Sequence, residues 1–292
     1  MDKQHTQRRR VLLAGAGAGT VVLTAVVGVA GVATAAPVKP KLAAQRQLVG
    51  AASDEFTGSA LDTAKWKTGL WYAKSGVGAF TDANVGVADG NLVLTAKKEA
   101  YNGSPYTFGA VESKFDVPGD SYVEVRAKVL DSRANVLSAI WLQSSPLSVQ
   151  NNPNPEIDIH ETFSYRRMVS TLHRWVWPYS DKSHLVDGDK RFDFGVTDTS
   201  TGYHVYGLER RNGRLRFYAD GRLGWDVAAP DPSYVNMARH MVLSLEGHLG
   251  QPNDAYLPST FLIDYVRTYG YTGGAGVKGV RPSVPTPSAT SR

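Results

Sequence analysis

One stretch of the sequence has the pattern of two strands and the turns beside them: Tyr203-His-Val-Tyr-Gly-Leu-Glu-Arg-Arg-Asn-Gly-Arg-Leu-Arg-Phe-Tyr-Ala-Asp-Gly221. Apolar and polar residues alternate in 203–209 and again in 214–219, which is typical of strands that bury one face of a sheet. Asn212-Gly213 and Asp220-Gly221 supply the positive φ angles that two-residue hairpin turns require. The stretch therefore predicts short antiparallel strands joined by tight turns.

The same alternation extends over much of the chain. It occurs in 91–96, just after Asp89-Gly90, and in 121–130. The apolar runs 136–142, 241–245 and 261–266 alternate less, as expected of strands that are covered on both faces. No amphipathic pattern predicts a helix longer than about two turns. The sequence therefore predicts an all-β fold, a two-sheet antiparallel sandwich.

The basic charge of the chain lies at its ends. The 292 residues carry a formal net charge of +5 and no cysteine. Each of the segments 1–35, 36–53 and 271–292 contributes +3, which leaves −4 for residues 54–270. This distribution argues against nucleic acid as a partner. The lack of cysteine excludes a disulfide framework, a zinc-thiolate site and a thiol nucleophile.

The first 35 residues have the pattern of an export signal peptide. Arg8-Arg9-Arg10 precedes an uncharged stretch, 11–38, and Ala33-Thr34-Ala35 offers a cleavage site, so the segment resembles a twin-arginine signal. The alternative is a permanent anchor, because 28 uncharged residues could span a bilayer. We expect cleavage, secretion, no stable membrane insertion and a monomer. Composition predicts a disordered linker over 36–53, one folded domain over 54–270 and a disordered tail over 271–292.

The most informative motif is Glu156-Ile-Asp-Ile-His-Glu161. On a regular strand Glu161 would point away from Glu156 and Asp158, whereas one β-bulge near Ile159-His160 would return it to their face. Two carboxyl groups about 5 to 5.5 Å apart perform retaining glycoside hydrolysis, one as nucleophile and one as acid/base. A third acid between them helps to separate their pKa values. The alternative is a solvated strand with acids on its wet face.

Aromatic residues on flanking segments favour a sugar cleft. Trp141, Trp175 and Trp177 could neighbour the acids, and sugar rings stack on flat apolar side chains.

Several further motifs make the chain resemble glycoside hydrolase family 16. They are 54–58 with Leu61-Asp62 and Lys65-Trp66, then 89–94, 106–113, 139–142, 203–209 with 213–221, and 264–269. These motifs occur in the order of that family over 54–270, and the Glu-x-Asp-x-x-Glu form is similar to its bulged members, which include laminarinases, agarases and carrageenases. The resemblance implies a jelly-roll sandwich with a concave substrate cleft.

The resemblance also implies roles for single residues. Glu156 would be the nucleophile, Asp158 its partner and Glu161 the acid/base, with no cofactor for catalysis. Substrate contacts are implied for Trp141, Asn84, His173, Trp175, Glu246 and His248. For four of these an ordinary role remains open: a loop cap for Asn84, a satisfied histidine for His173, and solvated side chains for Glu246 and His248.

Many family members bind a structural calcium ion away from the cleft, and a hard cation takes oxygen ligands. The resemblance places it at Asp264, the carbonyl of Gly90 and Glu55. The alternative for Asp264 is an ordinary surface acid.

We expect a secreted, endo-acting retaining hydrolase of a β-linked polysaccharide. The segment Leu245-Glu-Gly-His-Leu-Gly250 is closer to agarase-like members than to laminarinases, which favours an agarose-type galactan. The alternatives are a β-1,3-glucanase, a transglycosylase and a non-catalytic carbohydrate-binding jelly roll.

Overall fold

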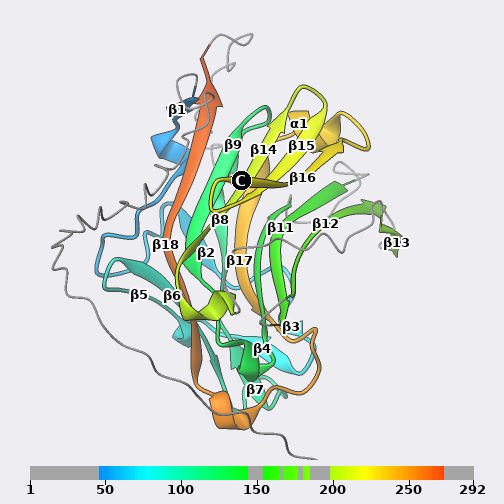
Figure 1. Ribbon diagram of the computed structural model, residues 1–292. Helices are drawn as coiled ribbons and strands as arrows, with labels where there is room; N and C mark the ends of the chain where they lie inside the picture. Colours follow the sequence, from blue (N-terminus) through cyan, green and yellow to red (C-terminus); the bar gives the residue numbers. More distant parts are fainter. Residues whose placement is uncertain (1–45, 144–153, 165–166, 177–179, 185–197, 273–292) are drawn as a thin grey trace, which may run out of the picture. The chain divides into compact units, whose positions relative to one another are not determined.

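The computed structural model describes residues 46–143, 154–164, 167–176, 180–184 and 198–272 (Figure 1). Trp177, the predicted signal 1–35, and residues 36–45 and 273–292 lie outside these ranges. Within them, no helix is long and apolar enough to cross a membrane.

The described strands form two sheets. The first runs in the order β16 (Arg222–Ala228), β15 (Arg214–Ala219), β14 (His204–Arg211), β9 (Tyr122–Lys128), β18 (Ser259–Tyr271), β6 (Asn91–Lys97), β7 (Tyr106–Phe108), β4 (Gly78–Phe80) and β3 (Lys74–Ser75). Two short strands join it: β1 (Arg46–Leu48) pairs with β18, and β5 (Val85–Ala88) pairs with β6.

The second sheet runs in the order β13 (Ser180–His184), β12 (Arg167–Val176), β11 (Asn154–Ser164), β10 (Leu137–Gln143), β17 (Arg239–Glu246), β8 (Ala110–Val117) and β2 (Trp66–Thr68). Of the described pairs, β4 with β7 is parallel and the others are antiparallel. The helical turns are η2 (Gly50–Ala52), η3 (Asp82–Asn84), η4 (Ser132–Ala134), η6 (Thr199–Thr201), α1 (Ser233–Asn236) and η7 (Asp254–Tyr256).

One hydrophobic core joins the two sheets. Val125 and Phe217 of the first sheet lie in the same buried cluster as Leu142, Ile157 and Leu243 of the second. Strands β6 and β15 alternate between buried and half-buried residues, as their sequence pattern predicts. The all-β, two-sheet sandwich is thereby confirmed.

The predicted hairpin turns are also confirmed. Both residues of Asp89-Gly90, Asn212-Gly213 and Asp220-Gly221 have positive φ, between 49° and 76°. This is the backbone that a two-residue turn between twisted antiparallel strands requires.

The strands extend beyond the predicted bounds of the folded domain, 54–270: they begin at Arg46 and end at Tyr271. Arg46–Leu48 is not linker, because it pairs with Tyr269–Tyr271, and the guanidinium of Arg46 lies 3.6 Å from the ring centroid of Tyr122. Tyr271 is not tail, because it ends β18 and its hydroxyl donates to Glu209 at 2.8 Å. Backbone pairing and ring contacts hold these polar ends, which composition alone does not reveal.

Candidate active site

Strand β11 contains the predicted bulge. In the ladder with β10, Ile140 pairs with His160 and Trp141 pairs with Asp158, which leaves Ile159 as the extra residue. The ladder with β12 shifts at the same place, between Asp158 and Glu161. The bulge near Ile159-His160 is thereby confirmed.

The bulge sorts the side chains of β11 onto two faces. Ile157 and Ile159 belong to the core between the sheets. His160 is also buried there, with its ring centroid 4.0 Å from that of Tyr206, and burial lowers the pKa of His160 to about 3. The three acids, Glu156, Asp158 and Glu161, all line one open cavity on the other face.

Glu156 accepts a hydrogen bond from Trp175, whose Nε1 lies 2.9 Å from Oε2. Burial, and then the negative charge of Asp158, raises the pKa of Glu156 well above its usual value. The indole bond acts in the opposite direction, because it stabilises the carboxylate.

Asp158 lies between the two glutamates and is 4% exposed. Burial raises its pKa well above the usual range, and the negative charge of Glu246 adds to this effect. His173 Nε2 lies 3.1 Å from Oδ2 of Asp158 and 3.9 Å from Oε1 of Glu156. Two neighbouring carboxyls of this kind share one proton. Because Trp175 favours charge on Glu156, the proton belongs on Asp158.

Glu161 also has a raised pKa. Burial, with the charge of Asp158 second, raises its pKa to about 8. Thr171 Oγ1 donates a hydrogen bond to its Oε2 at 3.3 Å. A carboxyl group that stays protonated near neutral pH is suited to general acid catalysis.

The acids line a cavity of about 300 Å³ together with aromatic side chains. Trp141 and Trp175 lie in its wall as predicted, and Trp71 and Tyr72 join them. The Trp71 and Trp141 ring centroids are 5.5 Å apart. Flat apolar rings beside carboxyl groups are the surfaces that a sugar chain needs.

Glu246 connects this wall by hydrogen bonds. Its carboxylate accepts from Tyr72 Oη at 2.9 Å and from Ser75 Oγ and Ser244 Oγ, each at 2.8 Å. Ser244 Oγ accepts in turn from Trp141 Nε1 at 3.1 Å, so Glu246 anchors the indole through one hydroxyl. His248 Nε2 lies 3.0 Å from Oε2 of Glu246, and this contact raises the pKa of His248.

The structure brings together most of the predicted substrate residues. Trp141, Trp175, Glu246 and His248 line the cavity, and His173 lies beside the acids. Asn84 does not join them: it ends η3, is 2% exposed and is not among the residues that line the cavity. Its backbone is packed so tightly that a Cβ at Gly109 would come within 2.4 Å of its carbonyl oxygen. The structure therefore favours the ordinary role left open for Asn84, that of a buried residue at the end of a helical turn.

Known proteins resemble the chain over the whole described fold. A family model described as β-porphyranase A–D, GH16 domain, matches residues 47–271. The chain belongs to glycoside hydrolase family 16. Members of this family are retaining endo-β-glycosidases that need no cofactor for catalysis.

Individual members of family 16 are distant. Glucan endo-1,3-β-glucosidase A1 of Niallia circulans is 28% identical over 259 residues, which cover 74% of this chain and 37% of that protein. β-Porphyranase B of Phocaeicola plebeius is 26% identical over 213 residues, covering 60% and 66%. β-Agarase A of Zobellia galactanivorans superposes with a TM-score of 0.65 at 22% identity, over 77% and 92% of the two chains, which shows the fold. The chain thus spans little more than a third of the glucosidase it matches.

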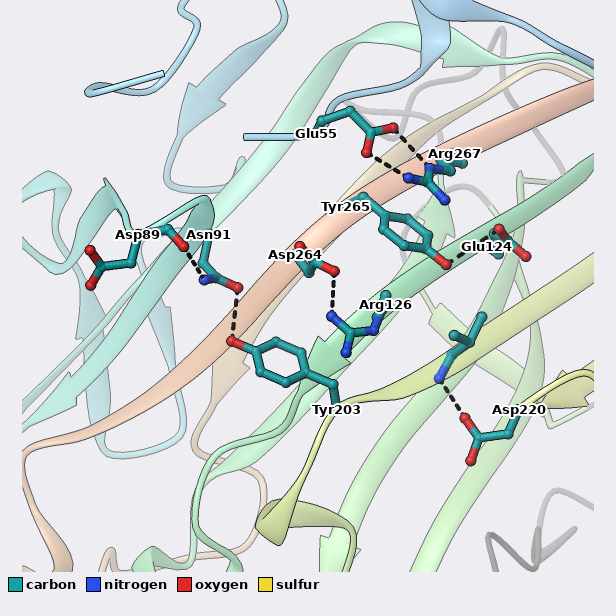
Figure 2. Close-up of polar contacts among 11 residues, drawn as sticks. Glu55, Asp89, Asn91, Glu124, Arg126, Tyr203, Asp220, Asp264, Tyr265 and Arg267 are labelled. Atoms are coloured by element: carbon teal, nitrogen blue, oxygen red, sulfur yellow. Dashed lines mark hydrogen bonds and ion pairs between the residues drawn. The ribbon is translucent and has the colours of Figure 1, made fainter. Parts of the chain in front are cut away.

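The calcium site implied by the family resemblance does not fit the side chains present. Asp264 Oδ2 lies 2.5 Å from Nη1 of Arg126, and both oxygens of Glu55 accept from Arg267 at 2.8 Å (Figure 2). Both carboxylates therefore already neutralise a guanidinium. Gly90 lies in its turn with φ of 72°, and its carbonyl alone makes no cation site.

Sequence reasoning missed part of the cavity wall. Trp71, Tyr72 and Ser75 lie between the motifs that end at Trp66 and begin at Asp89, and Gln143 follows Trp141 by two residues. The period of a strand would have placed Gln143 on the same face as Trp141. The hydrogen bond between Tyr72 and Glu246 joins residues 174 positions apart, and no local sequence pattern predicts it.

Proposed function

We propose that this protein is an endo-acting, retaining hydrolase of a β-linked galactan of the agar class, to which agarose and porphyran belong. The observation that carries the reaction type is the bulge of β11, which sets Glu156, Asp158 and Glu161 on one wall of the cavity. Burial raises the pKa of all three acids, and the hydrogen bond from Trp175 opposes this shift at Glu156, which favours Glu156 as the ionised nucleophile and Glu161 as the acid.

In the first step Glu156 attacks the anomeric carbon of the bound sugar. The glycosidic bond breaks as Glu161 gives its proton to the departing oxygen, and a covalent glycosyl-enzyme forms. In the second step Glu161 takes a proton from water, the resulting hydroxide attacks the anomeric carbon, and the carboxylate of Glu156 leaves. The two inversions retain the anomeric configuration.

Asp158 would assist Glu156 in both steps. Protonated Asp158 can donate to the carboxylate and remove repulsion between the two acids. The contact of His173 with Asp158 at 3.1 Å fixes the orientation of that carboxyl group.

The substrate class is supported by the family model and by the charge of the cavity. The matching model is that of β-porphyranase domains, and β-porphyranase B is among the relatives. Four carboxyl groups line the cavity against Lys74 and His248, which favours an uncharged galactosyl unit at the cleavage point. A second candidate is β-1,3-glucan, because a glucan endo-1,3-β-glucosidase is 28% identical.

The test is a reducing-sugar assay on agarose, porphyran, laminarin and lichenan, with wild type, Glu156→Ala and Glu161→Ala. We expect the highest kcat/KM on an agar-class galactan and losses of roughly 10² to 10⁴ or more in both variants. Azide should rescue Glu156→Ala and give the glycosyl azide of inverted configuration. Full activity of either variant would remove the mechanism. A laminarin value about tenfold above both galactans, roughly 1.4 kcal/mol, would transfer the assignment to glucan.

We also propose that the protein is secreted after cleavage of residues 1–35. The paired arginines and the small residues at 33–35 support this. Arg8→Lys with Arg9→Lys should block export, and N-terminal sequencing of the secreted form should begin near Ala36. A membrane-bound form that retains Met1 would contradict the proposal.

A further inference from the structure

Gln143 lies at the end of β10 and lines the catalytic cavity although it is only 1% exposed. The ladder pairs Leu142 with Ile157, so its next step sets Gln143 beside Glu156. Side chains that oppose one another on neighbouring strands have Cβ atoms about 4.5 to 5.5 Å apart. The amide therefore neighbours the nucleophile.

The amide of Gln143 is buried and unsatisfied. Neither Nε2 nor Oε1 has a hydrogen-bond partner within the described part of the chain. Two other polar groups of the wall are engaged: Trp175 Nε1 bonds Glu156, and the carboxylate of Glu246 accepts from several hydroxyls. Buried polar groups in folded proteins nearly always have partners, so an amide that faces a binding cavity with open donors and an open acceptor indicates a ligand.

We infer that Gln143 determines specificity by hydrogen-bonding one hydroxyl of the sugar unit that Glu156 attacks. A hydroxyl donates and accepts, and an amide offers both complements, whereas a sulfate ester offers acceptors only. A sugar that lacks this hydroxyl leaves the amide unpaired, which is how polar sites reject analogues. The identity of the sugar as a galactosyl unit rests on the proposed function.

The test compares wild type with Gln143→Leu, which keeps the size and removes both polar atoms. Gln251→Leu is the matched control, because Gln251 is an exposed loop residue that does not line the cavity. On galactan oligosaccharides we expect kcat/KM to fall about tenfold in Gln143→Leu and to stay unchanged in the control. Equal kcat/KM in wild type and Gln143→Leu would overturn the inference.

Oligosaccharides with a 2-, 4- or 6-deoxy sugar at the attacked position identify the hydroxyl. Loss of one particular sugar hydroxyl should lower the kcat/KM of wild type to the level of Gln143→Leu. The same loss should leave the kcat/KM of Gln143→Leu unchanged. If instead the variant loses the same factor on every analogue, Gln143 does not read a hydroxyl.

Thermal stability separates recognition from a structural role. Replacing an unpaired buried amide with an apolar side chain should leave the melting temperature of Gln143→Leu equal or higher. A lower melting temperature would assign Gln143 to the fold and overturn the inference. If wild type cleaves laminarin and not galactan, the proposed substrate is wrong, but the inference about Gln143 is still open to test. The same comparison of wild type with Gln143→Leu, made on deoxy laminarin oligosaccharides, then shows whether Gln143 binds a sugar hydroxyl.

Discussion

The indole Nε1 of Trp175 donates a hydrogen bond to Oε2 of Glu156 at 2.9 Å. The two residues lie on neighbouring strands, and the ladder pairs Glu156 itself with His173. The indole therefore reaches diagonally along the cavity face to the proposed nucleophile. Because the bond stabilises the charged carboxylate, it opposes burial and the neighbouring Asp158, both of which favour protonation.

Trp175→Phe should raise the pKa of Glu156 further, because the ring stays and the donor is lost. The nucleophile must be ionised, so the acid limb of the kcat/KM profile should move to higher pH by about one unit, which corresponds to roughly a tenfold loss on that limb. The measurement is the pH dependence of kcat/KM.

Trp66→Phe is the control for Trp175→Phe. Trp66 Nε1 makes the same kind of bond, 2.9 Å to Oδ2 of Asp54, but does not line the cavity. Trp66→Phe should lower the free energy of unfolding and leave the acid limb of the kcat/KM profile at the wild-type pH. An acid limb that does not move in Trp175→Phe would refute the role given to the indole.

Glu246→Ala should affect both stability and substrate binding. It removes the acceptor of Tyr72, Ser75 and Ser244, and the anchor of Trp141 goes with it. We expect the free energy of unfolding to fall by about 2 kcal/mol or more in denaturant titrations. KM should rise by a larger factor than kcat falls, because the role proposed for Trp141 is to contact the substrate and not the reacting bond.

Glu99→Ala is the control for Glu246→Ala, since exposed Glu99 accepts a single bond from Thr107 at 3.2 Å. It should change the free energy of unfolding by less than about 0.5 kcal/mol. Comparable destabilisation by the two changes would show that the hydrogen bonds of Glu246 contribute little to stability.

The hairpins and the bulge of β11 could be predicted because their causes are local. Asn212-Gly213 specifies its turn by conformational preference, and the spacing of Glu156, Asp158 and Glu161 requires one extra residue to share a face. Sequence patterns with a fixed period carry this information directly.

The features that were missed depend on contacts between distant segments. β1 is three residues long, and its partner strand β18 lies more than 200 positions later. The unpaired amide of Gln143 becomes evident only when the strands around it are assembled. Asn84 was assigned to the cleft from its place in a motif, whereas the structure buries it at the end of η3 and outside the cavity wall.

Calcium should leave the stability of the protein unchanged. Arg126 and Arg267 already neutralise Asp264 and Glu55, so a calcium ion would have to displace a guanidinium (Figure 2). We expect the same melting temperature with excess EDTA and with millimolar calcium chloride.

Arg126→Ala tests whether the guanidinium of Arg126 excludes calcium, because the change removes the ion pair with Asp264. If Arg126 replaces the ion, calcium should raise the melting temperature of this variant and not that of wild type. A calcium-dependent rise in wild type would restore the metal site.

Glu161 should govern the basic limb of the pH profile. It must be protonated to act as the acid, and burial raises its pKa to about 8, so kcat/KM should decline as pH rises through about 8. Glu161→Gln should remove this limb on substrates whose leaving group needs no proton. If the basic limb of wild type lies far from pH 8, or if it persists in Glu161→Gln, a group other than Glu161 is the general acid.

The same proton should make stability depend on pH. Between the ordinary glutamate pKa of 4.5 and about 8, the folded protein holds the proton of Glu161 and the unfolded chain has released it. The unfolded state then binds fewer protons, so the free energy of unfolding falls as pH rises through this window. Glu161→Gln should flatten the fall in denaturant titrations. Glu55→Gln is the control, because Arg267 lowers the pKa of Glu55 and its contribution is lost only as pH falls through that lowered value. An unchanged slope in Glu161→Gln would mean that another group carries the proton.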